Sequence, residues 1–117
     1  MTIKRINTNK RMSQATIYGK TIYLAGQVAV DTPNTSIATQ TNNILDRIDN
    51  LLAEAGSNKS RLLSATIWLT SMDNFDEMNS VWDNWLPSEN APARACVESR
   101  LAAPQFTVEI AVIAVVD

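Results

Sequence analysis

The first thirty residues alternate between apolar and polar positions, which is typical of β-strands that bury one face and expose the other. Alternating runs cover residues 2–6, 14–18 and 21–30. The second and third runs meet across Gly19-Lys20, a pair that predicts a tight hairpin turn. The pattern therefore predicts three strands joined as a meander at the start of the chain.

A helical period replaces this alternation after residue 36. Apolar positions then recur every three or four residues and form a continuous stripe on one face of a predicted helix: Ile37, Thr41, Ile44, Leu45, Ile48, Leu51, Leu52 and Ala55. The polar segment 31–36 before the helix offers N-cap oxygens, and Pro33 discourages continuation of the preceding strand. Gly56 follows the stripe as the expected C′ residue.

The second half of the chain repeats this change of period. Residues 63–70 alternate, and Leu63, Ala65, Ile67 and Leu69 are expected to share one face of a strand. Asp73 is the expected N-cap of a second helix, whose buried side is predicted to carry Phe75, Met78, Val81, Trp82 and Trp85.

Two more strands are predicted at the end of the chain, over residues 93–100 and 106–116. We expect them to form a hairpin that turns around Ala102-Ala103. The element order is then βββ-α-β-α-ββ, an α+β fold in a single domain of residues 1–117 with a mixed sheet of four or five strands. Both helices are expected on one face of the sheet. The other face carries Thr, Trp and small apolar residues, so we expect it to be buried against further copies of the chain.

Composition removes several kinds of chemistry. The 117 residues include no histidine and one cysteine, Cys96, so no Ser-His-Asp or Cys-His arrangement, Cys/His metal site or intrachain disulfide can form. The three glycines are too scattered for a phosphate-binding loop. The formal charge of −2 provides no basic surplus for nucleic acid or an anionic membrane. No run of residues is apolar enough for a membrane span, and we expect a cytoplasmic protein.

One group of side chains can carry chemistry. Alternation places Arg94, Cys96 and Glu98 on one face of a predicted strand, and the expected hairpin places Glu109 opposite Cys96 on that same face. A guanidinium group binds carboxylates in a bidentate way, and a nearby carboxylate can hold or activate a water molecule. The pattern predicts an anion-binding pocket, and spacing alone equally permits a structural ion pair between Arg94 and Glu109.

These residues resemble the signature of the RidA/YjgF family of imine/enamine deaminases, and within it the YoaB-like branch. PARACVES (92–99) followed by VEI (108–110) is similar to the family's Pro-Ala-Arg-x-x-Val-Glu motif and to its Glu fifteen residues after the Arg. The segments AGQVAVD (25–31) and DNFDEMNSVWDNW (73–85) extend the resemblance over nearly the whole chain.

The resemblance implies a chorismate-mutase-like protomer that assembles as a homotrimer, with a central barrel and three ligand clefts between subunits. It implies that Arg94 clamps the carboxylate of a 2-imino acid, that Glu109 positions the attacking water, and that the backbone of Cys96 faces the imine nitrogen. Asn79 matches an asparagine associated with the cleft in the family. The implied reaction converts imines such as 2-iminopropanoate and 2-iminobutanoate into 2-oxo acids and ammonia, and it needs no cofactor or metal.

Two positions depart from the family pattern. Met12 stands where many members carry a tyrosine over the substrate, and Ala25 stands where they carry a serine before Gly-Gln. Each change removes a potential hydrogen bond, worth about 0.5–1.5 kcal/mol. An alternative hypothesis is therefore a non-catalytic trimeric protein that binds small carboxylates such as 2-oxo acids.

Two further alternatives stay open from the sequence. In one, the protein is an interaction or chaperone-like trimer in which Arg94 is purely structural. In the other, it cleaves RNA, although the basic cluster Lys4, Arg5, Lys10 and Arg11 belongs to an acidic chain and is interpreted as solvated. Cys96 has no adjacent Lys and the chain has no His to lower the thiol's pKa, so we expect it to serve through its backbone and packing.

Overall fold

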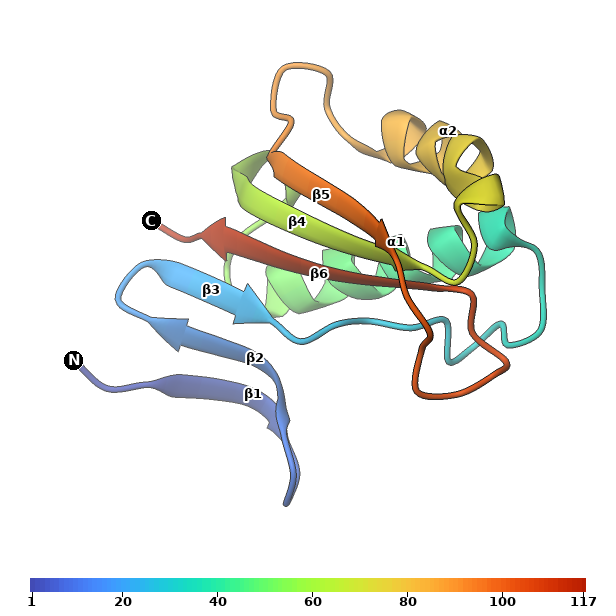
Figure 1. Cartoon of the computed structure of the whole chain (residues 1–117). Helices are drawn as coiled ribbons and strands as arrows, with labels where there is room; N and C mark the ends of the chain where they lie inside the picture. Colours follow the sequence, from blue (N-terminus) through green and yellow to red (C-terminus); the bar gives the residue numbers. More distant parts are fainter.

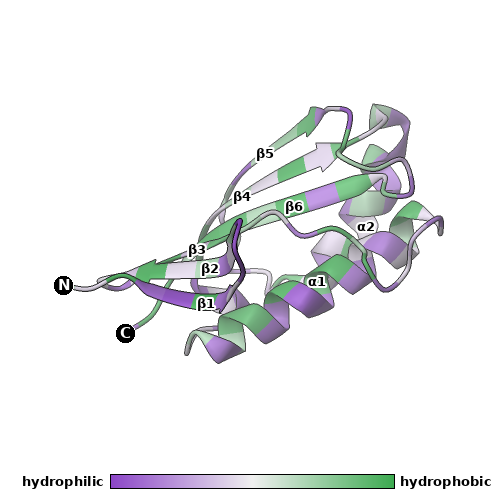
Figure 2. Ribbon diagram, turned by 90° about the horizontal axis from the view of Figure 1, so that it is seen from below, coloured by the Kyte–Doolittle hydropathy of each residue, from purple (hydrophilic) through white to green (hydrophobic).

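Six strands form one sheet that two helices cover on one side (Figures 1 and 2). The computed structural model describes all of residues 1–117. Its elements in chain order are β1 (Lys4–Thr8), β2 (Ser13–Tyr18), β3 (Thr21–Leu24), α1 (Ile37–Glu54), β4 (Leu62–Leu69), α2 (Phe75–Trp85), β5 (Ala93–Glu98) and β6 (Val108–Val115). The predicted order βββ-α-β-α-ββ is confirmed, but the sheet has six strands rather than four or five.

The strand order across the sheet is β1-β2-β3-β6-β4-β5, and every neighbouring pair is antiparallel except β4 with β5 (Figure 1). The last strand of the chain, β6, therefore lies in the middle of the sheet. Alternate residues of β6 are buried and those between them are only partly exposed, which accounts for its apolar sequence. Strand β5 forms one edge of the sheet and β1 forms the other.

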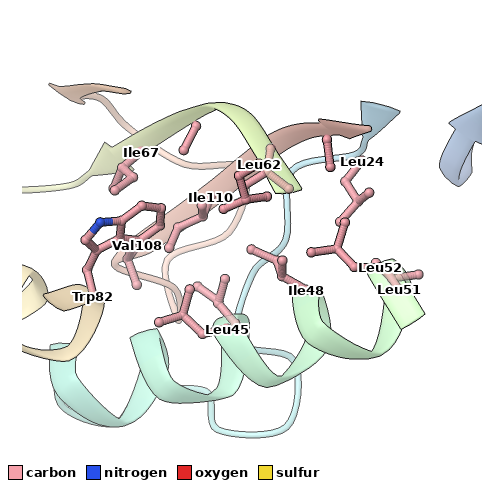
Figure 3. Close-up of a cluster of buried hydrophobic side chains, with 14 of the residues drawn as sticks. Leu24, Leu45, Ile48, Leu51, Leu52, Leu62, Ile67, Trp82, Val108 and Ile110 are labelled. Atoms are coloured by element: carbon pink, nitrogen blue, oxygen red, sulfur yellow. The ribbon is translucent and has the colours of Figure 1, made fainter. Parts of the chain in front are cut away.

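The core lies between the sheet and the helices (Figure 3). The predicted stripe of α1 is buried from Ile37 to Leu52, and α2 adds Met78 and Trp82. Both predicted ends of α1 are confirmed. The Oγ of Ser36 accepts the Thr39 N–H at 3.1 Å as an N-cap, and Gly56 has a φ of 85°, which favours glycine. Neither helix combines the length and apolarity needed to cross a lipid bilayer.

The predicted hairpin between β5 and β6 is wrong. β5 pairs only with β4, in parallel, and β4 separates it from β6. The physical reason is that α2 carries the chain from the end of β4 back to its start, which is the usual way to form a parallel pair. The following loop then passes the end of β4, where the Gln105 carbonyl accepts the Asn34 N–H at 3.0 Å.

The third predicted strand ends early. β3 stops at Leu24, and of residues 25–30 only Gln27 pairs with the sheet, through a bridge to Ile110. Tyr23 pairs with Ile113 and Gln27 with Ile110, so four steps along one strand face three along the other. The extra residue bulges out between them, as in strands whose direction changes next to a functional group.

Two other local predictions are wrong for similar geometric reasons. An irregularity between Leu62 and Ser64 turns Leu62 inward and Leu63 outward, so the core residue is Leu62. Asp73 does not cap α2, because a 3₁₀ turn (Met72–Asn74) precedes that helix and Ser71 caps the turn. Asn74 occupies the N-cap position of α2 without a side-chain hydrogen bond.

Leu62 and Leu63, whose burial is the reverse of the prediction, provide a test of this fold. Leu62 is 8% exposed and Leu63 is 50% exposed, although the two are chemically identical neighbours. We expect Leu62→Ala to lower the free energy of unfolding by about 2–4 kcal/mol, because it leaves a cavity in the core. Leu63→Ala is expected to lower it by clearly less, because it leaves no cavity in the core of the protomer. Urea unfolding at equal protomer concentration measures both, and equal losses would contradict the irregularity in β4.

Candidate functional site

Arg94 lies on the edge strand β5 with its guanidinium group over two aromatic rings. The Cζ atom is 5.5 Å from the centre of the Trp82 ring and 5.9 Å from that of Phe75. The two ion pairs in the molecule are Arg47 with Asp31 and Arg61 with Asp117, so no carboxylate neutralises Arg94. Stacking holds a guanidinium by its face and leaves its N–H groups at the rim available. The group is thus a fixed, unpaired cation suited to an anionic ligand.

Asn79 lies on α2 between the two rings that support Arg94. Phe75, Asn79 and Trp82 follow one another at steps of four and three residues, so they share one face of the helix. The Oδ1 atom of Asn79 is buried and has no hydrogen-bond partner. A buried acceptor without a partner is costly, and this one lies on the helix face whose aromatic rings contact Arg94. The structure therefore brings the predicted residues Arg94 and Asn79 to one side of the sheet.

Cys96 shares this side and packs against the core, since it pairs with the buried Ile67 of β4. Burial raises the pKa of its thiol, and the positive charge of Arg94 partly opposes that rise. A raised pKa keeps the sulfur protonated and argues against a nucleophilic thiolate. Cys96 packs as expected, and the expected use of its backbone stays a prediction.

The backbone of β5 presents hydrogen-bonding groups along the free edge of the sheet. The Ser99 N–H donates to the Leu69 carbonyl at 2.8 Å, toward β4. Successive residues of a strand point their N–H and C=O groups to opposite sides, so those of Arg94 and Cys96 point away from β4. No strand of this chain pairs with that edge. The backbone of Cys96 is therefore available to a ligand, close to the Arg94 side chain.

Glu109 lies in β6 with a half-buried carboxylate and no hydrogen-bond or ion-pair partner. Burial raises the pKa of this carboxyl group. Its Oε2 fills the space where Gly26 lacks a side chain, since a Cβ at Gly26 would lie 2.1 Å from that oxygen. Glycine is required there by close approach. An unpartnered carboxylate with a raised pKa is a stronger base than an exposed one.

The expected meeting of Arg94 and Glu109 on one face does not occur within one chain. Glu109 pairs with Trp68, and Trp68 pairs with Val97, so these three share the open face of the sheet. Arg94 pairs with the buried Ala65 and shares the helix-covered face. Two strand spacings, about 10 Å in all, also separate β5 from β6. The structural ion pair between Arg94 and Glu109 is thereby excluded within the chain.

The other two predicted positions fall on the side of Glu109 or beyond it. Ala25 precedes Gly26, and its N–H donates to the Gln14 carbonyl at 2.9 Å. Met12 lies in the loop between β1 and β2, is 39% exposed, and belongs to the sheet edge opposite Arg94. Within one chain the predicted residues thus separate into Arg94, Asn79 and Cys96 on the helix-covered side and Glu109 on the open face, with Met12 at the far edge of the sheet.

Sequence reasoning missed the residues that support Arg94 and Glu109. Phe75 and Trp82 were expected as core residues only, whereas their rings also hold the Arg94 side chain. Gly26 and Gln27 were expected inside a regular strand. The signal available for these two was a glycine and an uncharged polar residue in an otherwise apolar strand pattern, which can indicate a bulge. No group of three or more His, Cys, Asp or Glu side chains comes together in a way that could hold a metal ion.

Comparisons with known proteins agree with this fold. A model of the Endoribonuclease L-PSP family matches residues 2–116. A RutC family protein of Haemophilus ducreyi is 42% identical over 115 residues, which cover 98% of this chain and 97% of the relative. The RutC family protein YoaB of Escherichia coli is 39% identical over 116 residues, or 99% of this chain and all of YoaB. A crystal structure of a YjgF family protein from Neisseria meningitidis superposes with a TM-score of 0.93 at 43% identity, covering 100% of this chain and 97% of that one.

Proposed function

The chain belongs to the Endoribonuclease L-PSP family, which includes its YjgF and RutC relatives, and from this premise we propose that it is an imine/enamine deaminase. Its substrates would be reactive 2-imino acids such as 2-iminopropanoate and 2-iminobutanoate, and its products 2-oxo acids and ammonia. The observation that carries the proposal is the unpaired guanidinium of Arg94, held over Trp82 and Phe75 beside a free sheet edge. Such a group suits the planar carboxylate of a 2-imino acid.

Glu109 provides the second requirement, a base that holds water. In the proposed reaction the water oxygen attacks the carbon of the protonated C=N group while Glu109 accepts one water proton. The resulting carbinolamine then collapses: Glu109 returns its proton to the nitrogen, the C–N bond breaks as ammonia leaves, and a C=O bond forms as the hydroxyl proton passes through Glu109 to the ammonia, which departs as ammonium. A protonated imine is already electrophilic, so orientation and a water molecule suffice. The reaction needs neither a histidine nor a strong nucleophile.

We further propose that the two groups meet between subunits of a homotrimer. Arg94 and Glu109 lie on opposite faces of one sheet, so a cleft that uses both needs Arg94 from one protomer and Glu109 from its neighbour. The open face supports such an assembly, because it carries apolar and uncharged side chains around Glu109, among them Tyr23, Ala111, Ile113 and Val97. A central barrel of three such sheets would bury that face.

Met12 and Ala25 would modify this cleft rather than abolish it. Neither side chain can hydrogen-bond a substrate, so both offer apolar contact where a hydroxyl would contact water or substrate. We propose that the site accepts bulkier imines as a consequence. If the protein binds 2-oxo acids without turnover, these two residues account for the alternative of a carboxylate-binding trimer.

RNA cleavage, which the family description names, has weaker support in this chain. The formal charge is −2, and the basic residues Lys4, Arg5, Lys10 and Arg11 lie on β1 and its loop, at the sheet edge opposite Arg94. A nucleic-acid site needs a concentrated basic surface near the reacting groups. The proposed ligands are therefore small carboxylates, with no nucleic acid or membrane partner.

Replacement of Arg94 tests the anion site. We expect Arg94→Ala to lower kcat/KM for 2-iminobutanoate by roughly 100-fold or more, because charge-assisted hydrogen bonds to the carboxylate are lost. Arg94→Lys should retain only part of the wild-type kcat/KM, since an ammonium group cannot form the paired hydrogen bonds that a guanidinium group makes to a carboxylate. The imine is generated with an amino-acid oxidase and catalase, and the imine that remains is trapped with semicarbazide. The matched control is Arg100→Ala, which replaces an exposed arginine that has no ion pair. Retained turnover in folded Arg94→Ala would remove the proposed site.

The pH dependence tests Glu109 as the base. The carboxylate must be ionised to accept a proton, and burial raises its pKa, so kcat should fall on acidification at a pH above the ordinary glutamate value of about 4.3. Glu109→Gln should abolish this acid limb together with most of kcat. Since the ionised form is the one that burial destabilises, the amide variant should be at least as stable at pH 7. An unchanged profile in Glu109→Gln would assign the base elsewhere.

Mixing two inactive variants tests the shared cleft. If each cleft takes Arg94 and Glu109 from different protomers, trimers reassembled from equal amounts of Arg94→Ala and Glu109→Gln should regain about a quarter of wild-type activity, because a quarter of the clefts receive both intact groups. Light scattering should give the mass of a trimer for each variant and for the mixture. A protomer mass, or no recovery in mixed trimers, would contradict the shared cleft.

A further inference from the structure

Gln27 is one of four polar residues buried in the molecule, and it is only 2% exposed. Its side-chain Nε2 donates to Gln14 Oε1 at 2.9 Å and to the Ala25 carbonyl at 3.0 Å. Its Oε1 accepts from Arg47 Nε at 3.3 Å. The side chain therefore connects β2, α1 and the loop that follows β3. Buried networks of this kind hold one arrangement of the backbone, because each lost partner leaves a polar group unpaired.

The backbone of Gln27 links the same network to β6. Its N–H donates to the Ile110 carbonyl at 2.8 Å, and its carbonyl accepts the Ile110 N–H at 3.1 Å. This is the single bridge between residues 25–30 and the sheet. It joins the immediate neighbours of Gly26 and Glu109, the two residues whose close contact places the carboxylate.

Glu109 has no hydrogen bond or ion pair of its own to fix its position. Its carboxylate rests against the backbone of Gly26, and Gly26 belongs to a bulge outside the regular strand pairing. The Ala25 carbonyl on the other side of Gly26 is held by the Gln27 side chain. The charged member of the network, Arg47, contacts Gln27 and pairs with Asp31 at 3.8 Å, so it acts on Glu109 only through Gln27.

From these contacts we infer that Gln27 is the positioning residue for Glu109: its side chain fixes the Ala25–Gly26 segment against which the carboxylate rests. The inference rests on the proposed function for its effect on turnover. Its effect on the ionisation of Glu109 is independent of any activity. Loss of the Gln27 side-chain bonds would free the segment and admit water around the carboxylate, which lowers a pKa that burial had raised.

Gln27→Met tests the inference, because it keeps the length and volume of the side chain and removes its three hydrogen bonds. The matched control is Gln40→Met. Gln40 is also fully buried, and its side chain bonds the Thr35 and Gln105 carbonyls and the Thr107 N–H, away from Gly26. The pKa of Glu109 is measured by NMR titration of carboxyl groups labelled with carbon-13, with Glu109→Gln to assign the signal. Imine turnover is measured in parallel.

We expect Gln27→Met to move the Glu109 titration to lower pH and to lower kcat about tenfold or more with little change in KM, since the Arg94 anchor is untouched. Gln40→Met should lose stability without moving the titration. If Gln27→Met does not fold, Gln14→Met removes one bond of the network from a partly exposed position and should give a smaller shift in the same direction.

The outcomes separate the two proposals. An unchanged Glu109 titration in a folded Gln27→Met or Gln14→Met protein, or an equal shift in Gln40→Met, would overturn the role of Gln27. Absence of imine turnover in the wild type, together with the expected shift in titration, would overturn the proposed deaminase and leave the positioning of Glu109 by Gln27 supported.

Discussion

The insertion of β6 between β3 and β4 is the constraint on which the rest of the structure depends. This strand joins the N-terminal meander to the β4–α2–β5 unit, and it supplies Val108, Ile110, Val112 and Ala114 to the core. Because β6 occupies one edge of β4, β5 is left with the other edge, and the crossover through α2 makes that pair parallel. The same alternation that buries Ile110 turns Glu109 to the open face. The positions of Arg94 and Glu109 thus both follow from the packing of one strand.

Arg94 and Glu109 both lack an ion-pair partner, but they differ in burial. Arg94 is exposed and has no ion-pair partner, and aromatic rings fix its orientation without neutralising it. A carboxylate partner would have fixed it as well but would have occupied the N–H groups that a ligand needs. Glu109 is half-buried and has no partner, so the same lack of neutralisation raises its pKa and strengthens it as a base. A structural ion pair between them would have removed both properties.

Irregular backbone occurs where the carboxylate needs room. The bulge after β3 brings Gly26 against Glu109, and a regular strand with any side chain at that position would collide with it. Such a bulge gives up ladder hydrogen bonds, and the buried Gln27 side chain replaces part of them. Two of the buried polar side chains thus hold irregular backbone: Gln27 holds the segment that contains Gly26, and Gln40 anchors the loop before β6.

The sequence by itself determined the elements and the residues with chemistry. The stripe of α1, its Ser36 and Gly56 ends and the alternation of β6 depend on neighbouring residues, and local periodicity encodes them directly. The motif around Arg94 and Glu109 could also be recognised from the sequence. Strand pairing could not be predicted, because a hairpin and a parallel crossover bury the same alternating pattern. Only the tertiary structure placed β4 between β5 and β6, turned Leu63 outward and separated Arg94 from Glu109 by a sheet, since these follow from which edges and volumes remain free once the core has packed.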